Sequence, residues 1–514
     1  MPYGIAQLAS VADKWGATVD VFDANMLRVN VESMRADLKE GTKEVEMEYD
    51  IFAFSGLVTT YSWQKQAIRA LRSDWPDTFF IAGGGCASSL QKDMLKWIPE
   101  LDAIALGEGE NTLRELLELV EKKNLPKGIS KVAGVMFRED LEKWAQLPEK
   151  PNKKKRKVRE LLEQRPKVSI KRNPPRKLMT ETELNHLPYP AWWMFDLEPR
   201  SEKGRYIPGY FANSPLSLSI EALQCRRRLD IISERGCPGR CRFCSHGLLG
   251  GDQMPDGSQL KPLVRWQSAE YVTDMIQYML VHYKIDFIAF MDETFLFNKK
   301  RTHQFLDLLE EKDLSGTFRW GCLGRAEVPD RELLARLREG GCTYISYGFE
   351  SSSQQNLDYL EKGNTVAQQE MTLKATIAAK INPITSYIIG YPDETLQSLY
   401  DTAKFWVVNG IVEIQPFFLT PYPYTRVYWE NEERILAQYG GDKERFVEAC
   451  GDATEFTVNL TKRFSDPEIL GLRDLMTMHD LERIRDYAKR RGEPIVDPNP
   501  PQSERKTKIV EDSK

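Results

Sequence analysis

Three cysteines lie close together near the middle of the chain. Cys237, Cys241 and Cys244 are separated by three and two residues, within the segment 229–251 (LDIISERGCPGRCRFCSHGLLGG), and Phe243 precedes the third cysteine. Soft thiolate ligands select zinc, copper(I) or iron–sulfur clusters. Structural zinc takes four protein ligands, whereas a four-iron cluster held by three cysteines leaves one iron open to a substrate or cofactor. The spacing therefore predicts a metal centre with one open position.

A closed zinc site is the alternative for the same loop. It needs a fourth ligand, for which Cys225 or His246 stands nearby in the sequence. We favour the cluster, because three thiolates and an open position already suit it. The cysteines outside the loop are spread thinly, as expected of small buried side chains; they are Cys86, Cys225, Cys322, Cys342 and Cys450. Without a secretory signal, this usage predicts reduced thiols and no disulfide framework.

The whole chain has the composition of an ordinary globular protein. Its 514 residues predict two or three domains, since domains run roughly 100–200 residues. Hydrophobic residues make up 41% and charged residues 29%, and the net charge of −5 gives no general attraction for nucleic acid. No apolar run reaches the roughly 18 residues that span a bilayer, and the start MPYGIAQLAS lacks a signal-peptide pattern. We therefore expect a cytoplasmic location, no membrane span and no nucleic-acid partner.

Residues 1–140 alternate helical and strand patterns. The apolar spacing predicts helices over residues 5–15, 63–75, 90–97 and 112–122, and strands over 18–22, 49–55, 79–82, 101–106 and 132–137. This alternation is typical of a doubly wound parallel sheet, because parallel strands need crossover helices. The chain opens in a helix, so the strand that normally begins such a sheet is absent. We therefore expect a late start codon or a fragment, since an empty central position exposes unpaired edges.

Glycines and small polar residues follow three successive strands of this domain. Ligands of open α/β sheets bind outside the carboxyl ends of the strands, and glycine lets the backbone approach a large ligand closely. Ordinary tight turns explain any single exit equally well, but three in succession favour a shared crevice. The candidate binding residues are Ser55, Gly56, Thr59, Gly84, Gly85, Ser88, Gly107 and Glu108.

A basic, proline-rich stretch over residues 141–215 separates this domain from the next pattern. It includes the runs 153–157 (KKKRK) and 171–177 (KRNPPRK). Basic runs mark either nucleic-acid patches or solvated linkers, and the acidic remainder of the chain favours a linker.

Six further strand–helix units follow in residues 216–430. The predicted strands cover residues 230–234, 286–291, 318–323, 343–349, 383–389 and 411–418. Six consecutive units predict a partial (β/α)6 barrel of the TIM type, with its chemistry on the loops after the strands. Tyr422, Tyr424 and Trp429 suit an aromatic substrate pocket or core packing equally. Residues 431–514 are predicted to be helical, with a disordered tail from residue 497.

The cysteine loop follows the first strand of this barrel, and its C-x3-C-x2-C pattern with Phe243 resembles the signature of the radical S-adenosylmethionine (SAM) superfamily. The resemblance implies a [4Fe–4S] cluster on the three cysteines, cleavage of SAM by one electron to a 5′-deoxyadenosyl radical, and an external electron donor such as flavodoxin or ferredoxin. Similar family positions imply SAM contacts at Asp292 and Glu293 (amino group), Arg325 (carboxylate), Glu350 and Ser351 (ribose), and Ile388 and Gly390 (adenine).

A doubly wound domain ahead of such a barrel resembles the cobalamin-binding class of that superfamily. The resemblance implies that the glycine-rich exits hold cobalamin, with its nucleotide tail near Ser55, Thr59, Gly84 and Ser88. Methionine synthase and the mutases supply an axial histidine from a D-x-H-x-x-G motif. The present chain has no histidine before His186, so we expect base-off cobalamin without a histidine ligand from this domain.

The resemblance implies an enzyme that methylates an unactivated carbon of a small-molecule substrate. An oxidative cyclisation like that of anaerobic Mg-protoporphyrin IX monomethyl ester cyclase is the alternative within the family. A non-catalytic cobalamin- or cluster-binding sensor is the alternative outside it. A sensor leaves Asp292, Glu293, Arg325 and Glu350 without a task.

Overall fold

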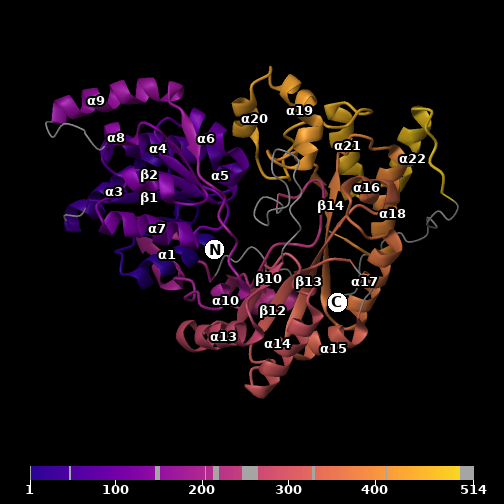
Figure 1. The fold of residues 1–514 in the computed structure, drawn as a ribbon. Coiled ribbons are helices and arrows are strands. Elements are labelled where there is room, and N and C mark those ends of the chain that lie inside the picture. Colours follow the sequence, from indigo (N-terminus) through magenta and orange to yellow (C-terminus); the bar gives the residue numbers. More distant parts are fainter. Residues whose placement is uncertain are drawn as a thin grey trace.

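The computed structural model describes residues 2–45, 48–144, 151–202, 204–211, 219–245, 264–326, 330–412 and 414–497. An N-terminal sheet domain lies beside a larger barrel domain, and C-terminal helices connect the barrel back to the N-terminal domain (Figure 1). This arrangement confirms the predicted fold class of a doubly wound domain followed by a partial barrel and a helical region.

Five strands form the N-terminal sheet in the order β1-β2-β3-β4-β5. β1 (Ile51–Ser55), β2 (Phe79–Gly83) and β3 (Ala103–Ala105) are parallel, as the sequence predicted. β4 (Val135–Arg138) and β5 (Ile170–Arg172) add an antiparallel edge. Because β5 comes from the stretch predicted to be a linker, the end of this sheet does not coincide with the domain boundary predicted at residue 140.

Helices cover both faces of this sheet. Phe80 and Ala82 of β2 pack into one hydrophobic cluster, whereas Phe79 and Ile81 pack into another on the opposite face. This alternation follows from the period of two along a strand. The helices of the domain are α1 (Tyr3–Trp15), α2 (Ala24–Leu27), α3 (Val31–Val45), α4 (Tyr61–Asp74), α5 (Gly84–Leu90), α6 (Lys92–Trp97), α7 (Glu110–Glu121) and α8 (Leu141–Trp144), with the 3₁₀ turns η1 (Val58–Thr60) and η2 (Lys127–Lys131).

Two predictions for the N-terminal half differ from the structure. Residues 18–22 form no strand: β1 is the edge of the described sheet, and these residues do not pair with its free side. The basic stretch instead contains α9 (Pro151–Gln164), which lies along the outside of the domain (Figure 1). Behind α9, in η3 (Arg165–Lys167), the buried Arg165 side chain pairs with Asp102 and Asp140. Such buried pairing ties this segment to the sheet, since an unpaired buried charge is costly.

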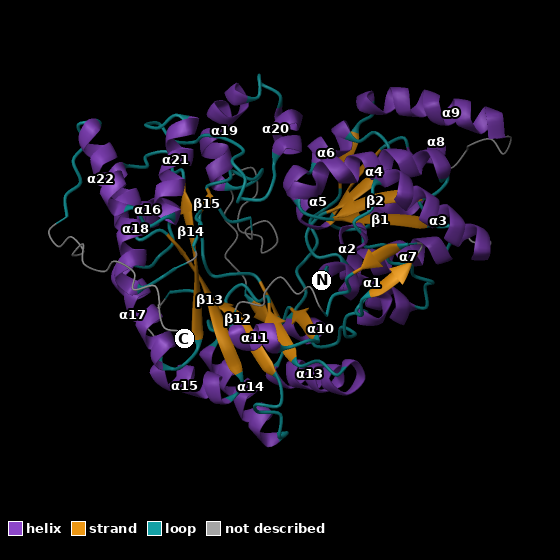
Figure 2. Cartoon of the chain, turned by 180° about the vertical axis from the view of Figure 1, so that it is seen from behind, coloured by secondary structure: helices purple, strands orange, loops and turns teal. Residues whose placement is uncertain are grey.

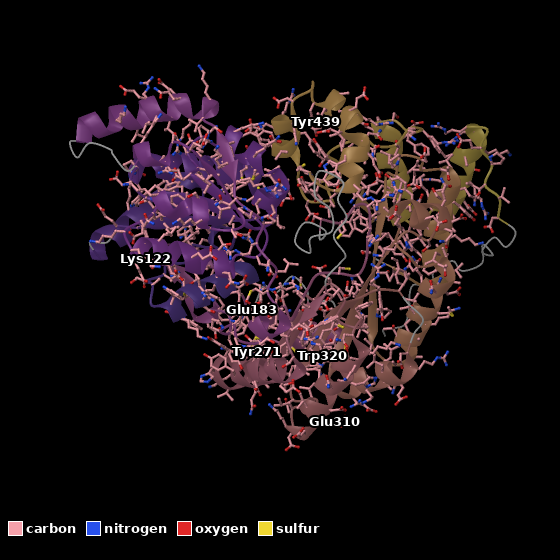
Figure 3. All side chains as sticks on the ribbon, viewed as in Figure 1. Lys122, Glu183, Tyr271, Glu310, Trp320 and Tyr439 are labelled. Atoms are coloured by element: carbon pink, nitrogen blue, oxygen red, sulfur yellow. The ribbon has the colours of Figure 1, made fainter. Side chains whose placement is uncertain are left out.

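The barrel domain is an open sheet of six parallel strands in the order β15-β14-β13-β12-β11-β8. Helices lie on its outer side, as in a partial (β/α)6 barrel (Figure 2). Trp320 of β12 is fully buried against Phe290, Phe295 and Phe305 at the barrel core (Figure 3). The strands are β8 (Arg228–Ile231), β11 (Phe287–Phe290), β12 (Arg319–Gly324), β13 (Cys342–Glu350), β14 (Asn382–Ile389) and β15 (Phe417–Phe418).

Most of the barrel helices begin at side-chain caps, and α16 is the exception among those described. Ser268 caps α13, and Thr365 and Thr395 form capping boxes at α17 and α18, so polar residues fix where these helices start. The helices are α13 (Ala269–Tyr283), α14 (Lys299–Glu311), α15 (Arg331–Glu339), α16 (Gln354–Leu360), α17 (Val366–Ala378) and α18 (Leu396–Asn409). The segment before the barrel contains α10 (Glu181–Leu184), η4 (Trp192–Met194), β6 (Arg200–Glu202), β7 (Arg205–Ile207) and α11 (Ile220–Gln224).

The C-terminal helices serve two different neighbours. α20 (Lys443–Ala449) packs on the N-terminal domain, where Glu444 accepts hydrogen bonds from Tyr61 Oη at 2.7 Å and Lys65 Nζ at 2.6 Å. The remaining helices are α19 (Arg426–Gln438), α21 (Asp466–Thr477) and α22 (Leu481–Arg490), of which α21 and α22 pack on α18. Of the tail predicted to be disordered from residue 497, Asp497 is described and pairs with Lys404 at 2.6 Å and Arg485 at 2.8 Å; the rest lies outside the described residues. Within the described ranges, no helix is long and apolar enough to cross a membrane.

Candidate active site

The cysteine loop lies at the carboxyl end of β8, as predicted. The loop is flanked by β9 (Glu234–Arg235) and β10 (Arg265–Trp266), which pair with each other as a short antiparallel ribbon. All three thiols are half-buried, and none of them forms a disulfide. The ribbon thus holds both ends of a segment that contains the loop.

Two donors face the thiols of this loop. The backbone N–H of Gly239 donates to Cys237 Sγ at 3.4 Å, and Arg325 Nη1 lies 3.8 Å from Cys241 Sγ. Burial raises the pKa of Cys237, while the Gly239 N–H and the Arg325 charge lower it. Positive partners favour the thiolate form, which is the form that binds metal. Burial outweighs both donors, so the pKa of Cys237 lies above its usual value and the two donors only partly offset this.

The loop is anchored from the other side by Arg242. Its backbone N–H donates to Leu360 O at 3.0 Å, and its carbonyl accepts from Val427 N at 3.2 Å. Its guanidinium pairs with Glu361 at 3.0 Å and Glu430 at 2.8 Å. The loop is thus tied to α16 and to α19, and the C-terminal helices help to fix its position.

Asp292 and Glu234 form a buried carboxylate pair next to the cysteine loop. Asp292 is fully buried and accepts from the backbone and hydroxyl of Ser233 and from the backbone N–H of Glu234. Glu234 in turn accepts from Thr294 and, at 3.1 Å, from Trp266 Nε1. Burial and the charge of Asp292 raise the pKa of Glu234 to about 8. The carboxylate oxygens of Asp292 are therefore occupied by hydrogen bonds to the residues just before the cysteine loop. The sequence had suggested instead that they bind the SAM amino group.

The other predicted SAM residues divide into two groups. Glu293, Arg325 and Gly390 lie at strand exits, and the charge of Glu293 raises the pKa of Cys237. Gly390 has φ +91° and a Cβ there would lie 3.9 Å from Leu419 N, so the chain has room beside it. Ser351, by contrast, is 1% exposed and hydrogen-bonded to Thr402 Oγ1 at 3.2 Å. Its hydroxyl is therefore committed within the protein and is not free to accept a ribose.

The remaining two positions also make contacts of their own. Glu350 ends β13 and forms a buried ion pair with Lys362 at 2.8 Å. Ile388 lies opposite Phe417 in the sheet and packs in a hydrophobic cluster that Phe243 adjoins. Both remain predicted SAM contacts.

The donor set fits a cluster better than a single zinc ion. Within the ranges that the structure describes, no group of three or more His, Cys, Asp or Glu side chains is close enough to hold one metal ion. A zinc site needs four ligands converging on one ion, whereas three thiolates around a multi-iron cluster are held further apart. His246, one nominee for a fourth zinc ligand, lies outside the described residues.

The first two strand exits of the N-terminal domain form a backbone-lined cradle. Cys86 N donates to Gly56 O at 2.8 Å, which joins the two exits. Gly84 has φ +74°, and a Cβ there would lie 2.6 Å from Ser55 Oγ. Leu57 beside them is 66% exposed. A glycine cradle next to an exposed apolar side chain suits a large, flat cofactor such as cobalamin.

The predicted contacts at the two ends of this crevice are placed differently. Thr59 lies exposed in η1 beside the cradle, and Gly85 is the second residue of α5. Ser88 is 3% exposed inside α5, and its Oγ accepts from Gly107 N at 3.4 Å. The sequence predicted that residues 83–89 form a loop after the second strand. Residues 84–89 fold instead into α5, which turns Ser88 toward the third exit.

The third exit binds the barrel domain. Glu108 pairs with Arg265 at 2.8 Å and with Arg235 at 3.2 Å, and Glu110 also pairs with Arg235. Arg265 and Glu110 are buried, and the side chain of Glu108 is 8% exposed. Glu108, predicted as a cobalamin contact, therefore joins the N-terminal domain to the ribbon that flanks the cysteine loop. We call these four residues the interdomain ion-pair cluster.

Sequence reasoning missed Lys362, Glu110, Arg235 and Arg265. Arg235 stands two residues before Cys237, but nothing in its sequence neighbourhood shows its partner, which is 125 residues away. The aromatic trio proved to be packed: Tyr424 and Trp429 stack edge to face at 5.1 Å, and Tyr422 Oη donates to Gly451 O at 3.0 Å.

Comparisons with known proteins agree with this geometry. A family model described as the radical SAM superfamily matches residues 231–405, and one for the B12-binding domain matches residues 1–117. The chain belongs to the radical SAM superfamily. With its N-terminal B12-binding domain, it falls in the cobalamin-dependent class of that superfamily.

Relatives with curated names are distant. An uncharacterized methyltransferase of Pyrococcus horikoshii is 27% identical over 355 residues, covering 69% of this chain and 63% of the relative. The anaerobic magnesium-protoporphyrin IX monomethyl ester cyclase of Cereibacter sphaeroides is 23% identical over 438 residues, covering 84% of this chain and 61% of the relative. The chain thus spans about three fifths of the length of these two relatives.

A solved structure shares the fold. The radical S-adenosylmethionine methyltransferase TsrM from Kitasatospora setae, with tryptophan substrate and a SAM analog bound, has a TM-score of 0.58 and 16% sequence identity. The match covers 85% of this chain and 73% of TsrM.

Proposed function

We propose that this protein is a cobalamin-dependent radical SAM enzyme that methylates an unactivated carbon of a small molecule. The observation that carries the proposal is the placement of the cysteine loop. It lies at the carboxyl end of β8 and is joined by the interdomain ion-pair cluster to the strand exits of the B12-binding domain. These ion pairs support the proposal because they would hold the two proposed cofactor sites in a fixed relative position.

The residues of the barrel divide the work of holding the first two cofactors. Cys237, Cys241 and Cys244 hold the cluster, and Glu293 and Arg325 offer opposite charges to the ammonium and carboxylate of SAM. Arg325 also lies 3.8 Å from Cys241 Sγ, so it is placed beside the loop that it serves. Bound there, the cluster supplies the electron that cleaves SAM, and cobalamin supplies the methyl group.

The N-terminal residues position the third cofactor. A Cβ at Gly56 would lie 2.5 Å from Thr60 Oγ1 and one at Gly84 would lie 2.6 Å from Ser55 Oγ, so both positions require glycine, and Leu57 presents apolar surface beside them. The first histidine of the chain, His186, contacts the carbonyl of Thr182 through Nδ1 and lies beyond the B12-binding match. We therefore propose base-off cobalamin without a histidine from this domain, and one-electron reduction by a donor such as flavodoxin or ferredoxin.

Oxidative cyclisation is the second candidate function. The observation that favours it is the similarity to the protoporphyrin ester cyclase, which extends over 84% of this chain. The non-catalytic sensor is less consistent with the site, because Glu293 and Arg325 would then lie beside the thiols without a ligand to hold.

Anaerobic reconstitution tests these candidates. We expect uptake of about four irons per chain and release of 5′-deoxyadenosine from SAM in the presence of dithionite. Iron uptake without deoxyadenosine would favour the sensor and contradict the enzyme. Label from methyl-labelled SAM should appear in the product of a methyltransferase, whereas a cyclase product carries none.

A further inference from the structure

One buried lysine has no part in the roles assigned so far. Lys362 lies between α16 and α17, and its side chain is 8% exposed. Its Nζ donates to Glu350 Oε1 at 2.8 Å, and Glu350 is equally buried. A buried ammonium is costly unless it is paired, so this partner keeps the lysine charged in place.

The backbone beside the Glu350–Lys362 ion pair has an uncommon conformation that leaves room for the two side chains. Glu350 has φ +65°, a left-handed conformation that non-glycine residues seldom adopt. Its carbonyl accepts from Tyr391 Oη at 3.2 Å, which helps to hold that conformation. A Cβ at Gly348 would lie 2.3 Å from Glu350 Oε1 and 3.0 Å from Lys362 Nζ. Strain of this kind persists only where the surroundings enforce it and is typical of functional sites.

Lys362 adjoins the cysteine loop in two ways. Its Nζ lies 5.8 Å from the centre of the Phe243 ring, the aromatic residue of the cysteine motif. Its carbonyl accepts from the Arg325 guanidinium, whose other nitrogen faces Cys241 Sγ. Burial lowers the pKa of Lys362, but the charges of Glu350 and Cys241 raise it above its usual value. The ammonium therefore stands within electrostatic reach of the metal ligands.

We propose that Lys362 raises the reduction potential of the metal centre held by the cysteine loop, and that Glu350 opposes it. The inference rests on the proposed function, because it requires a [4Fe–4S] cluster on the three cysteines. Reduction by one electron adds one negative charge to the cluster. A fixed cation in a site of low dielectric stabilises the reduced form more than the oxidised form, and a fixed anion does the reverse.

The test is a redox titration of the full chain, reconstituted anaerobically, without SAM and monitored by electron paramagnetic resonance. Dithionite is the electron donor for the one-electron couple of the cluster. Lys362→Met removes the charge and keeps an apolar stem, and we expect a more negative midpoint potential. A tenfold change in the ratio of oxidised to reduced cluster corresponds to about 59 mV for one electron. Lys362→Arg should keep the wild-type potential.

Glu350→Gln is the opposing variant, and its midpoint potential should move in the positive direction. Lys374→Met is the matched control, because Lys374 is exposed and pairs with Glu370 on α17; its potential should equal that of the wild type. Thermal melting and iron content are measured on every variant. If Lys362→Met does not fold, the sign of the Glu350→Gln shift decides.

Two results would overturn the inference. One is a set of iron-loaded variants whose potentials all equal the wild type, which would leave Lys362 as a structural residue. The other is a shift of the same sign in Lys362→Met and Glu350→Gln. A wild-type protein that takes up no iron contradicts the proposed function instead, so the two failures are distinguishable.

Discussion

The two sets of strand exits differ in the chemistry they present. Charged side chains lie around the cysteine loop: Glu293, Arg325 and Glu350 at the barrel exits, and Lys362 between α16 and α17. The first two exits of the N-terminal domain present glycine backbone and Leu57, and the glutamates of its third exit bind the other domain. An anionic cluster and a zwitterion need placed charges, whereas a large flat cofactor needs a close and neutral surface. The difference teaches that each half is built for a ligand of its own.

The largest expected effect is the loss of the iron–sulfur cluster from the barrel domain while the N-terminal domain still binds cobalamin. Cys241→Ala removes one of three cluster ligands, so iron uptake and formation of 5′-deoxyadenosine should both be lost. Cobalamin binding should remain, because no residue of the N-terminal cradle is altered. Iron analysis and the visible absorption of bound cobalamin measure the two outcomes.

Cys225→Ser is the control for this variant. Cys225 lies outside the loop and is half-buried, and its thiol donates to Glu221 O at 3.4 Å. Its iron content should match the wild type. A loss of iron in Cys225→Ser would instead support a metal site with Cys225 as its fourth ligand.

Gly84→Val is the reverse experiment. The substitution forces a branched side chain into a left-handed conformation at a cost of about 1–3 kcal/mol, and its Cβ would lie 2.6 Å from Ser55 Oγ. We expect at least a tenfold loss of cobalamin affinity with iron content unchanged, measured by equilibrium titration. Gly471→Ala is the control, because a Cβ there meets no atom within 4 Å. Unchanged cobalamin affinity in Gly84→Val would show that the glycine cradle is not part of the cobalamin site.

The interdomain ion-pair cluster is tested by Glu110→Gln. Removing one charge of a buried pair leaves Arg235 less compensated, so the free energy of unfolding should fall by roughly 3 kcal/mol. Denaturant titration measures this change. Glu493→Gln breaks a partly exposed pair with Arg463 and should change the stability by less than about 1 kcal/mol. Equal losses of stability in the two variants would show that the interdomain ion-pair cluster does not stabilise the contact between the domains.

The last prediction concerns pH. The folded state raises the pKa of Glu234 to about 8, so Glu234 keeps a proton that the unfolded chain releases near the ordinary glutamate pKa of 4.5. Stability should therefore decline as the pH rises from about 5 to about 8, with a slope of at most about 1.4 kcal/mol per pH unit from this group. Glu234→Gln, which cannot ionise, should flatten this part of the curve in chemical denaturation. An unchanged slope would show that Glu234 is ionised in the fold.

Most of the fold could be predicted from local patterns. Apolar runs such as the one that became β11 and capping residues such as Thr365 act within a few residues, so both parallel sheets were predictable. β5 and α9 were not, because Arg165 and its partners Asp102 and Asp140 come together only when distant segments meet. The stretch around them is polar and basic, and its sequence alone resembles a solvated linker.

The sequence by itself determined the chemistry of the site. The spacing of Cys237, Cys241 and Cys244 and the glycines at 56 and 84 are local properties, and they named the candidate cofactors. Only the tertiary structure decided which charged side chains face those cofactors. It committed Asp292 and Ser351 to internal hydrogen bonds, turned Glu108 toward the barrel, and brought Lys362 to the cysteine motif. The physical reason is that a side chain's role depends on its partners, and these partners lie up to 157 residues away.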